Sequence, residues 1–229
     1  MKAVILAAGR GERMRPYTDY SPKPLIKFRR APMIDHVVAS LVKGGASEVI
    51  VVTGYRSDAL EDHLRSLPVD GLRVVRNPDW RRGNATSLFA ATPLLGGEPF
   101  IVSMADHIHD AALVRGAVEG YGGTSILCVD REPVYLNDMG DATKVRVGAD
   151  GYVTAIGKGL KRWDAVDTGL FALSPRVLDL GGPFRELSEV MGVLISERGL
   201  MACDATGSPW VDLDTVDDLV NAVEAAYWV

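Results

Sequence analysis

The sequence has few cysteines and no long hydrophobic run, and both shortages limit what the chain can be. Its 229 residues contain two cysteines, Cys128 and Cys203, each in an apolar, strand-like run. Two thiols do not make a disulfide framework, so we expect buried free thiols and a reducing compartment. No run approaches the roughly 18 apolar residues that a membrane span needs, and Met1-Lys2 leads directly into a strand pattern instead of a signal peptide. The expected location is the cytoplasm.

Two familiar phosphate-binding loops are also missing key residues. The apolar run Ala3-Leu6 is followed by Gly9 and Gly11, but the third glycine of a dinucleotide-binding fingerprint is replaced by Met14. A P-loop would end in Gly-Lys-Ser/Thr, whereas a glutamate and an arginine follow Gly11. What is present is a strand, a small-residue turn whose free amides can bind phosphate, and a cluster of cations.

The charge of the chain is unevenly distributed. The net charge is -5, but residues 1–30 carry eight Lys or Arg against two acidic residues, a local charge of +6 that leaves -11 for the remainder. Nucleic-acid-binding proteins usually present a basic face. A short basic segment in an acidic protein instead fits a small polyanion held in a cleft, so we expect no nucleic-acid partner.

Apolar runs alternate with helical patterns through the first 130 residues. The runs predict strands at Ala3-Leu6, Glu48-Thr53, Leu72-Arg76, Phe100-Met104 and Thr124-Val129. The 3.6-residue periodicity between them predicts helices at Met33-Lys43, Asp58-Leu67, Asn84-Leu95 and Ala111-Tyr121. This βαβ alternation indicates an α/β protein with a mostly parallel sheet flanked by helices.

The pattern changes in the second half of the chain. Residues 144–147 and 152–156 flank a glycine-rich turn and predict a hairpin, which gives this half an α+β character. Further elements are predicted at Val166-Leu173, Phe184-Arg198 and Thr215-Tyr227, the last with Val216, Leu219, Val220 and Val223 facing inward. No linker, internal repeat or low-complexity tract interrupts the chain. We therefore expect one domain over residues 1–229.

Carboxylates follow two of the predicted strands. Ligands bind outside the carboxyl ends of strands in an open parallel sheet, so residues just after apolar runs are candidates for a site. Asp106 follows the Phe100-Met104 run, and Asp212 follows a short strand at Trp210-Val211, with Asp214 two residues on. Two carboxylates facing a polycationic glycine loop are what a Mg²⁺-bound triphosphate requires.

These carboxylates also have plainer interpretations. Asp106 could form a turn, or could join the two histidines after it in a metal cluster, although Asp-His-x-His lacks closed zinc spacing. Either Asp212 or Asp214 could cap the last predicted helix, with Thr215 as the rival cap.

The basic residues of the glycine loop also have both a functional and a plainer interpretation. Lys23 stands between two prolines, which stiffen the backbone that carries its ammonium group. Arg13 and Lys23 could be solvated surface charges, as most such residues are. Their clustering beside a glycine turn favours phosphate contacts.

Several motifs together resemble a known family. "LAAGRGERMRP" followed by "SPKPL" is similar to the triphosphate loop of nucleotidyltransferases that activate phosphorylated sugars and alcohols, and the likeness continues through "GN", "TSL", "MADH", "IGKGL", "DTGLF" and "WVDLDT", over nearly the whole chain. Within the family, "DREP", "GDATKVRV", "AIGKGL" and "VDTGLFAL" look most like the CTP:inositol-1-phosphate cytidylyltransferase branch. "GERMRPYTDYSPKPL" is closer to the hexose-1-phosphate branch, with Glu12 where that branch usually has threonine.

The resemblance implies a fold and a role for each motif. The fold would be the Rossmann-like nucleotidyltransferase fold, with a smaller α+β acceptor-binding part in the second half. Arg13 and Lys23 would neutralise the triphosphate, and Lys158 would meet the phosphate of the acceptor; Asn84 could otherwise be only a helix N-cap. The nucleotide-binding positions it implies are Leu6, Ala7, Ala8, Gly9, Arg10, Gly11, Gly83, Asn84, Ser87 and Ala105. The acceptor-binding positions it implies are Lys144, Asp167, Thr168 and Gly169.

The activity implied is in-line transfer of a cytidylyl group from CTP to a phosphorylated alcohol, most closely inositol-1-phosphate, with release of pyrophosphate. The cofactor would be Mg²⁺ on Asp106 and Asp212, with Asp214 the less favoured ligand. The partners would be small molecules, and some members of this branch are joined to a membrane CDP-alcohol transferase. Three alternatives stay open: a hexose-1-phosphate enzyme using UTP, dTTP or GTP, a cytidylyltransferase for phosphocholine or a phosphonate, and a non-catalytic nucleotide-sensing subunit.

Overall fold

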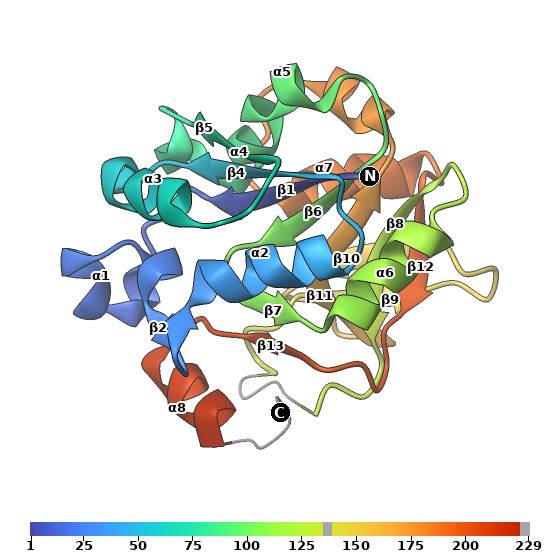
Figure 1. Cartoon of the computed structure of the whole chain (residues 1–229). Helices are drawn as coiled ribbons and strands as arrows, with labels where there is room; N and C mark the ends of the chain where they lie inside the picture. Colours follow the sequence, from blue (N-terminus) through green and yellow to red (C-terminus); the bar gives the residue numbers. More distant parts are fainter. Residues whose placement is uncertain (135–138, 225–229) are drawn as a thin grey trace.

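The centre of the molecule is a sheet whose first strand is apolar on both faces. The computed structural model describes residues 1–134 and 139–224. β1 (Lys2–Ala7) is buried from Ala3 onward, which is the pattern of a strand covered on both sides. It pairs in parallel with β4 (Glu48–Thr53) and β6 (Phe100–Met104), and β4 pairs in parallel with β5 (Leu72–Arg76). These four strands form the parallel part of the sheet (Figure 1).

The sheet changes direction on the other side of β6. There β11 (Ala165–Leu173) runs antiparallel to β6, and it also pairs with β8 (Ser125–Asp130) and β9 (Lys144–Val147). The predicted hairpin is confirmed, because β9 pairs antiparallel with β10 (Val153–Gly157). β12 (Leu200–Asp204) pairs in parallel with β8 and sets Cys203 opposite Cys128, both as free thiols. The predicted α/β fold with a mostly parallel core and an α+β second half is therefore confirmed.

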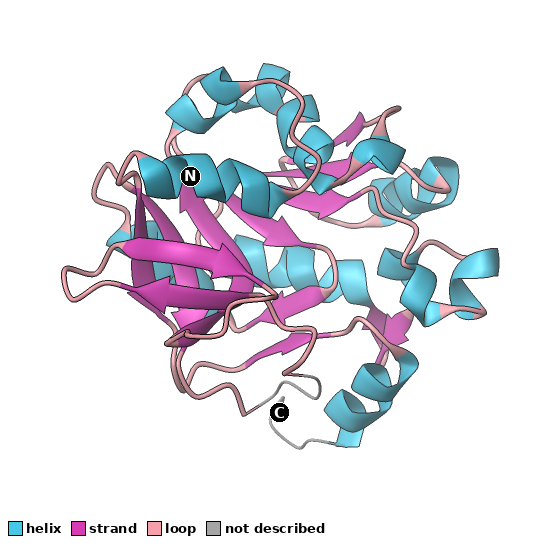
Figure 2. Cartoon of the chain, turned by 180° about the vertical axis from the view of Figure 1, so that it is seen from behind, coloured by secondary structure: helices cyan, strands magenta, loops and turns pink. Residues whose placement is uncertain are grey.

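Helices cover both faces of the sheet (Figure 2). Alternate residues of β1 belong to two cores: Ala3, Ile5 and Ala7 pack on one face, and Val4 and Leu6 on the other. The helices that contribute most to the first core are α2 (Met33–Lys43), α3 (Ser57–Ser66) and α6 (Ala111–Gly120). The α-helices that contribute most to the second core are α4 (Asn84–Ala90), α5 (Thr92–Leu95) and α7 (Leu187–Ser196).

Short elements complete the described chain and bring distant segments to the edge of the sheet. An antiparallel ribbon joins β7 (His107–His109) to β13 (Trp210–Asp212), with Asp212 opposite His107. A second ribbon joins β2 (Lys27–Phe28) to β3 (Ala31–Pro32). The remaining helices are η1 (Glu12–Met14), α1 (Tyr17–Tyr20), η2 (Lys23–Leu25), η3 (Trp80–Arg82), η4 (Pro175–Leu180) and α8 (Val216–Glu224). None of the helices in the described ranges is long and apolar enough to cross a membrane.

Two sequence-based helices differ from the structure. The helix predicted at Asn84-Leu95 is divided at Ala91, because Pro93 cannot supply the amide that a continuous helix needs. In α8 the prediction that Val220 and Val223 face inward was wrong: their exposed fractions are 50% and 46%.

The inward face of α8 is set by its first turn. Thr215 Oγ1 accepts a hydrogen bond from the Asp218 amide, and the Asp218 carboxylate accepts from the Thr215 amide. This exchange orients the helix so that Asp218 and Ala222 are buried. Thr215, and neither Asp212 nor Asp214, is therefore the residue that caps α8. The predicted helix end at Tyr227 lies outside the described residues.

Candidate active site

The loop after β1 folds tightly over a buried lysine. Gly11 has φ +67°, and a Cβ atom there would lie 2.7 Å from Cβ of Lys23, so only glycine lets the two segments approach this closely. Lys23 is 7% exposed, and its Nζ donates to Oδ2 of Asp106 at 2.5 Å and to Oδ1 of Asp214 at 2.6 Å. Burial lowers the pKa of Lys23, but the two carboxylates outweigh it and hold the pKa above its ordinary value. The lysine is a fixed positive charge.

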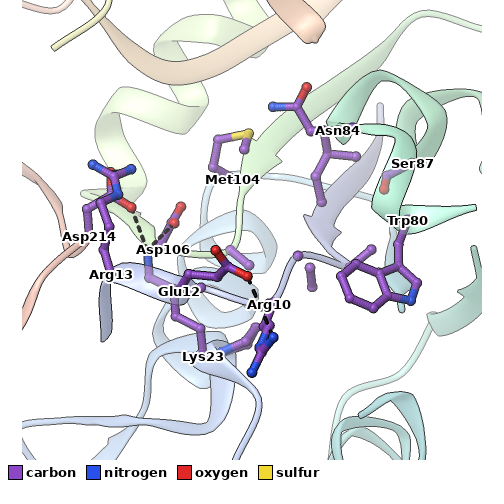
Figure 3. Close-up of a pocket in the computed structure, with 18 of the residues that line it drawn as sticks. Arg10, Glu12, Arg13, Lys23, Trp80, Asn84, Ser87, Met104, Asp106 and Asp214 are labelled. Carbon is purple, nitrogen blue, oxygen red and sulfur yellow. Dashed lines mark hydrogen bonds and ion pairs between the residues drawn. The ribbon is translucent and has the colours of Figure 1, made fainter. Parts of the chain in front are cut away.

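A cavity of about 540 Å³ opens between this loop and the start of α4, a volume in the range of small-molecule sites. Figure 3 shows Arg10, Lys23, Asn84 and Asp106 arranged around it. All ten positions predicted to bind the nucleotide line this cavity, which we call the nucleotide-side cavity. Further lining residues that the sequence reasoning missed are Glu12, Pro24, Trp80, Arg81 and Met104.

Trp80 is the most substantial of the residues that were missed. Its ring packs edge-on against Tyr55, with centroids 5.6 Å apart, and the guanidinium of Arg81 lies 4.4 Å from the Trp80 ring centroid. The signal in the sequence was an aromatic residue three positions before Gly83, close to the predicted nucleotide-binding positions Gly83, Asn84 and Ser87.

A second cavity of similar volume, about 540 Å³, adjoins the first. Three of the positions predicted to bind the acceptor, Lys158, Asp167 and Gly169, line it, and α7 contributes residues such as Ser188. We call it the acceptor-side cavity. The residues that line both cavities are Arg13, Asn84, Met104, Asp106 and Asp214.

Two predicted acceptor-side residues do not line either cavity. Thr168 is fully buried, where its hydroxyl donates to the carbonyl of Cys128 and its carbonyl meets Nε2 of His109 at 2.7 Å. Lys144 Nζ donates to the carbonyl of Lys158 at 3.1 Å. In this structure Thr168 and Lys144 support the backbone around the cavity.

The side chain of Asn84 joins two elements of the site. Its Oδ1 accepts a hydrogen bond from the amide of Leu187 at 2.7 Å, so it fixes the start of α7 to the start of α4. The alternative that Asn84 caps its own helix does not hold, because Asn84 is already the first helical residue and Gly83 precedes it as the cap.

Two carboxylates and one histidine form the group of described residues that could hold a metal ion. Asp106, His107 and Asp212 each offer one ligand atom, and these atoms lie within 4.8 Å of one another. Gly169 makes this possible, since a Cβ atom there would lie 2.5 Å from the His107 ring. Oδ1 of Asp212 is buried and meets no hydrogen-bond donor among the described residues, which suits a cation ligand. Asp214 stands outside this group and pairs with Lys23.

The charges of this group are strongly coupled. Burial raises the pKa of Asp106, but Lys23 and His107 outweigh it and hold that pKa well below its ordinary range. Burial likewise raises the pKa of Asp212, here to about 7, because the nearby Asp106 adds to the effect. Burial lowers the pKa of His107, yet Asp212 and Asp106 bring it to about 10. Both ring nitrogens of His107 face carboxylates, Nδ1 at 3.0 Å from Asp106 and Nε2 at 3.6 Å from Asp212. With this raised pKa the ring carries a proton on each nitrogen, so the carboxylates are the groups that remain available to bind a metal.

Six side chains of alternating charge connect the two cavities. Lys23 lies between Asp106 and Asp214, and Arg13 lies between Asp214, at 2.6 Å, and Asp141, to which it also donates a hydrogen bond. Asp141 accepts in turn from Nζ of Lys158 at 2.7 Å. We call this series the charge chain; its members are Asp106, Lys23, Asp214, Arg13, Asp141 and Lys158. The sequence reasoning missed Asp141, although it lies in the motif "GDATKVRV".

Comparisons with known proteins show which family the chain is similar to. A model of the MobA-like NTP transferase domain matches residues 3–141. The chain is 40% identical over 226 residues to a bifunctional IPC transferase and DIPP synthase of Rubrobacter xylanophilus, covering 95% of this chain and 50% of that protein. The corresponding protein of Archaeoglobus fulgidus is 33% identical, with 98% and 44% covered. The chain thus spans about half the length of these curated relatives.

Solved structures show the same fold. The inositol-1-phosphate CTP transferase from T. maritima superimposes with a TM-score of 0.87 at 27% identity, covering 97% of this chain and 94% of that one. A UDP-glucose pyrophosphorylase complexed with UDP-glucose superimposes with a TM-score of 0.84 at 18% identity, over 99% and 98% of the two chains. The second likeness concerns the fold alone.

Proposed function

The chain belongs to the MobA-like NTP transferase family, and on that premise we propose that it transfers a cytidylyl group from CTP to a phosphorylated alcohol, with inositol-1-phosphate as the preferred acceptor. The products are a CDP-alcohol and pyrophosphate. Proteins similar to nearly the whole of this chain carry the names bifunctional IPC transferase and DIPP synthase, of which the chain spans half, and inositol-1-phosphate CTP transferase, which supports this choice of substrates. The proposal includes one domain over residues 1–229 and a cytoplasmic location.

The observation that carries the proposal is the meeting of two cavities at one set of charged side chains. Arg13, Asp106 and Asp214 line both cavities, so a group bound in either one reaches the same charges. A group-transfer enzyme needs this arrangement, because donor and acceptor must be held with their reacting atoms in contact. A nucleotide-sensing subunit needs only the first cavity.

The nucleotide-side cavity suits a nucleoside triphosphate. The glycine turn of residues 9–11 offers backbone amides at the carboxyl end of β1, and Arg13 and Lys23 supply positive charge. We assign base recognition to the start of α4, where Asn84 and Ser87 line the cavity. Since Asn84 Oδ1 is used by the Leu187 amide, its amide nitrogen and nearby backbone groups are the ones available to the base.

The carboxylates fit a magnesium ion. We assign Asp106 and Asp212 as its ligands, because Mg²⁺ prefers oxygen donors and Oδ1 of Asp212 has no donor among the described residues. Asp214 is assigned instead to holding Lys23 and Arg13. When bound, Mg²⁺ withdraws negative charge from the phosphate oxygens of the nucleotide.

The chemistry is a single in-line displacement. An oxygen of the acceptor phosphate forms a bond to the α-phosphorus of CTP, and the bond to the β-phosphate breaks, so that the electron pair leaves with pyrophosphate. A phosphate monoester has a second pKa of about 6, so it is largely dianionic near neutral pH and needs no general base. The task of the protein is to hold two anions together. Lys23 and Arg13 act on the triphosphate and Lys158 on the acceptor phosphate.

The acceptor-side cavity supplies groups for a polyol. Asp167 and Ser188 line it, and both carry oxygens that can bond to hydroxyl groups. The Asp167 carboxylate already accepts from the Gly169 amide at 2.7 Å, which fixes its orientation toward a ligand. We assign Asp167 and Gly169 to the acceptor and leave Lys144 and Thr168 as supporting residues.

A pyrophosphate-release panel tests the proposal. It crosses CTP, UTP, dTTP and GTP with inositol-1-phosphate, glucose-1-phosphate, phosphocholine and aminoethylphosphonate in magnesium buffer. We expect the highest kcat/KM for CTP with inositol-1-phosphate. Selectivity against UTP should be roughly ten- to hundredfold, because uracil has a hydrogen-bond acceptor where cytosine has its amino donor. In the UTP complex a buried polar group is then left unpaired, at a cost of about 1 to 3 kcal/mol. A higher value for glucose-1-phosphate with UTP would overturn both substrate assignments, and no turnover with any pair would favour a sensing subunit.

A further inference from the structure

Asp141 is the one member of the charge chain that the proposed chemistry leaves without a role. Its Oδ1 accepts from Nζ of Lys158 at 2.7 Å, and its Oδ2 accepts from the Arg13 guanidinium. Arg13 lies on η1 and lines both cavities, and the proposed chemistry assigns it to the triphosphate; Lys158 follows β10 and lines the acceptor-side cavity, as Asp141 does. One carboxylate therefore touches a cation from each side of the reaction.

From this geometry we propose that Asp141 is a positioning residue, which fixes Arg13 and Lys158 at the spacing that the two reacting phosphates require. The inference rests on the proposed function. Arg13 has five N–H donors and Lys158 has three, so each keeps donors for a phosphate while it is held by Asp141. Orienting long, flexible cations before substrate arrives lowers the cost of ordering them in the transition state.

The exposure of these groups agrees with a positioning role more than with a role in stability. The side chains of Arg13, Lys158 and Asp141 are 50%, 55% and 38% exposed, and ion pairs this exposed contribute little to folding. Burial raises the pKa of Asp141, but Lys158 and Arg13 outweigh it, so the carboxylate stays ionised.

Neutralising Asp141 should change the rate in opposite directions under two explanations, simple electrostatics and positioning. A negative charge beside a site for two anions repels them, so neutralising it should strengthen anion binding and raise the rate. Positioning predicts a loss, because Lys158 would then sample other rotamers and Arg13 would keep only one of its two carboxylate partners, Asp214. The sign of the change in rate therefore separates the two explanations.

The test is a double-mutant cycle on Asp141→Asn and Lys158→Ala, measured with the nucleotide and acceptor pair that gives the highest kcat/KM in the substrate panel. In the parent background, Asp141→Asn should lower kcat/KM for the acceptor about tenfold. In the Lys158→Ala background the same substitution should cost less than about threefold, because one of the two cations that Asp141 holds is gone and the other, Arg13, is still held by Asp214. The dissociation constant of CTP, measured by calorimetry, should change by less than about threefold in Asp141→Asn.

Asp150→Asn is the matched control. Asp150 forms a comparably exposed pair with Arg198 at 2.7 Å, and neither residue lines the nucleotide-side or the acceptor-side cavity. The variant should keep the parent rate. An unchanged or higher rate in Asp141→Asn, or an equal loss in both backgrounds, would overturn the positioning role. If a pair other than CTP and inositol-1-phosphate were best, only the substrate assignment would fail; no turnover with any pair would overturn both proposals.

Discussion

Asp106 is the residue on which most of the proposed chemistry depends. It follows β6, contacts Lys23 at 2.5 Å and His107 at 3.0 Å, and lines both cavities. Sequence reasoning selected it from its place after a strand alone. The position of a strand end can be recognised in a sequence, but the partners of the carboxylate come from segments up to 83 residues away.

The Asp106→Asn variant should lose magnesium-dependent turnover. Asparagine keeps the shape of aspartate but removes the charge that binds Mg²⁺, and removal of one such electrostatic group lowers the rate by about 10²-fold or more. Initial rates of pyrophosphate release across a magnesium titration would measure the loss. Thermal melting of the variant serves as the control for folding. Turnover within a few-fold of the parent would exclude Asp106 as a metal ligand.

At the scale of the element, Glu61 of α3 ties the helix to two strands. Its Oε1 accepts from Thr53 of β4 at 2.9 Å, and both its carboxylate oxygens accept from Arg76 of β5, at 3.0 and 2.9 Å. The hydrogen bonds from Arg76 hold the pKa of Glu61 below its ordinary value, although burial opposes them. The contacts bridge three elements at the edge of the sheet.

This carboxylate should make stability depend on pH. Its pKa is lower in the folded state than the value of about 4.3 in the unfolded chain, so its contribution is fully present above about pH 5 and is lost as the pH falls below 4. We expect Glu61→Gln to lower the free energy of unfolding at pH 7 by about 1 kcal/mol, since Arg76 is half exposed. Denaturant unfolding at pH 7 and at pH 3.5 would measure the difference between parent and variant.

The matched control is Asp62→Asn on the same helix. Asp62 is 73% exposed and pairs only at the surface, with Arg65, so its substitution should cost less than about 0.5 kcal/mol at either pH. An equal loss from both variants, or a Glu61→Gln deficit that persists unchanged at pH 3.5, would show that the Glu61 contacts do not stabilise the folded state.

Over the whole molecule, the two cavities meet where the sheet changes from parallel to antiparallel. β6 pairs with β1 in parallel on one side and with β11 antiparallel on the other, and Asp106 follows it at this boundary. The nucleotide-side cavity lies against the parallel part, and the acceptor-side cavity takes residues from β11 and α7. Ligands bound at this point contact elements from both halves of the chain.

Nucleotide binding should therefore stabilise the folded chain as a unit. A ligand present at 100 times its dissociation constant adds about 2.7 kcal/mol, which for a chain of this length corresponds to a rise in Tm of roughly 5 to 10 °C. Thermal scans with equal concentrations of CTP, UTP, dTTP and GTP in magnesium buffer would measure it. We expect the largest shift with CTP, and a larger shift with any of the others would contradict the nucleotide assignment.

The sequence predicted the parallel core well because its strands are short apolar runs with clear ends. Its failures have local causes. Pro93 divides a helix whose apolar pattern continues across the break, and the first turn of α8 rotates Val220 outward. The triphosphate loop was predicted to line a site, and its residues do line a cavity. Asp141 could not be predicted from spacing, because its partners lie 128 and 17 residues away and are brought to it only by the fold.

The placement of two tryptophans gives the protein a built-in optical reporter. Trp80 lines the nucleotide-side cavity and is partly exposed, whereas Trp210 lines the acceptor-side cavity, is 1% exposed and donates to Asp130 at 2.8 Å. An indole in contact with water emits at longer wavelengths than a buried one. The chain also contains Trp163, which is 37% exposed, and Trp228. In a variant with both of these replaced by phenylalanine, the red edge of the intrinsic fluorescence follows the first cavity and the blue edge the second, so that the order in which the two ligands arrive can be read from the emission spectrum without a label.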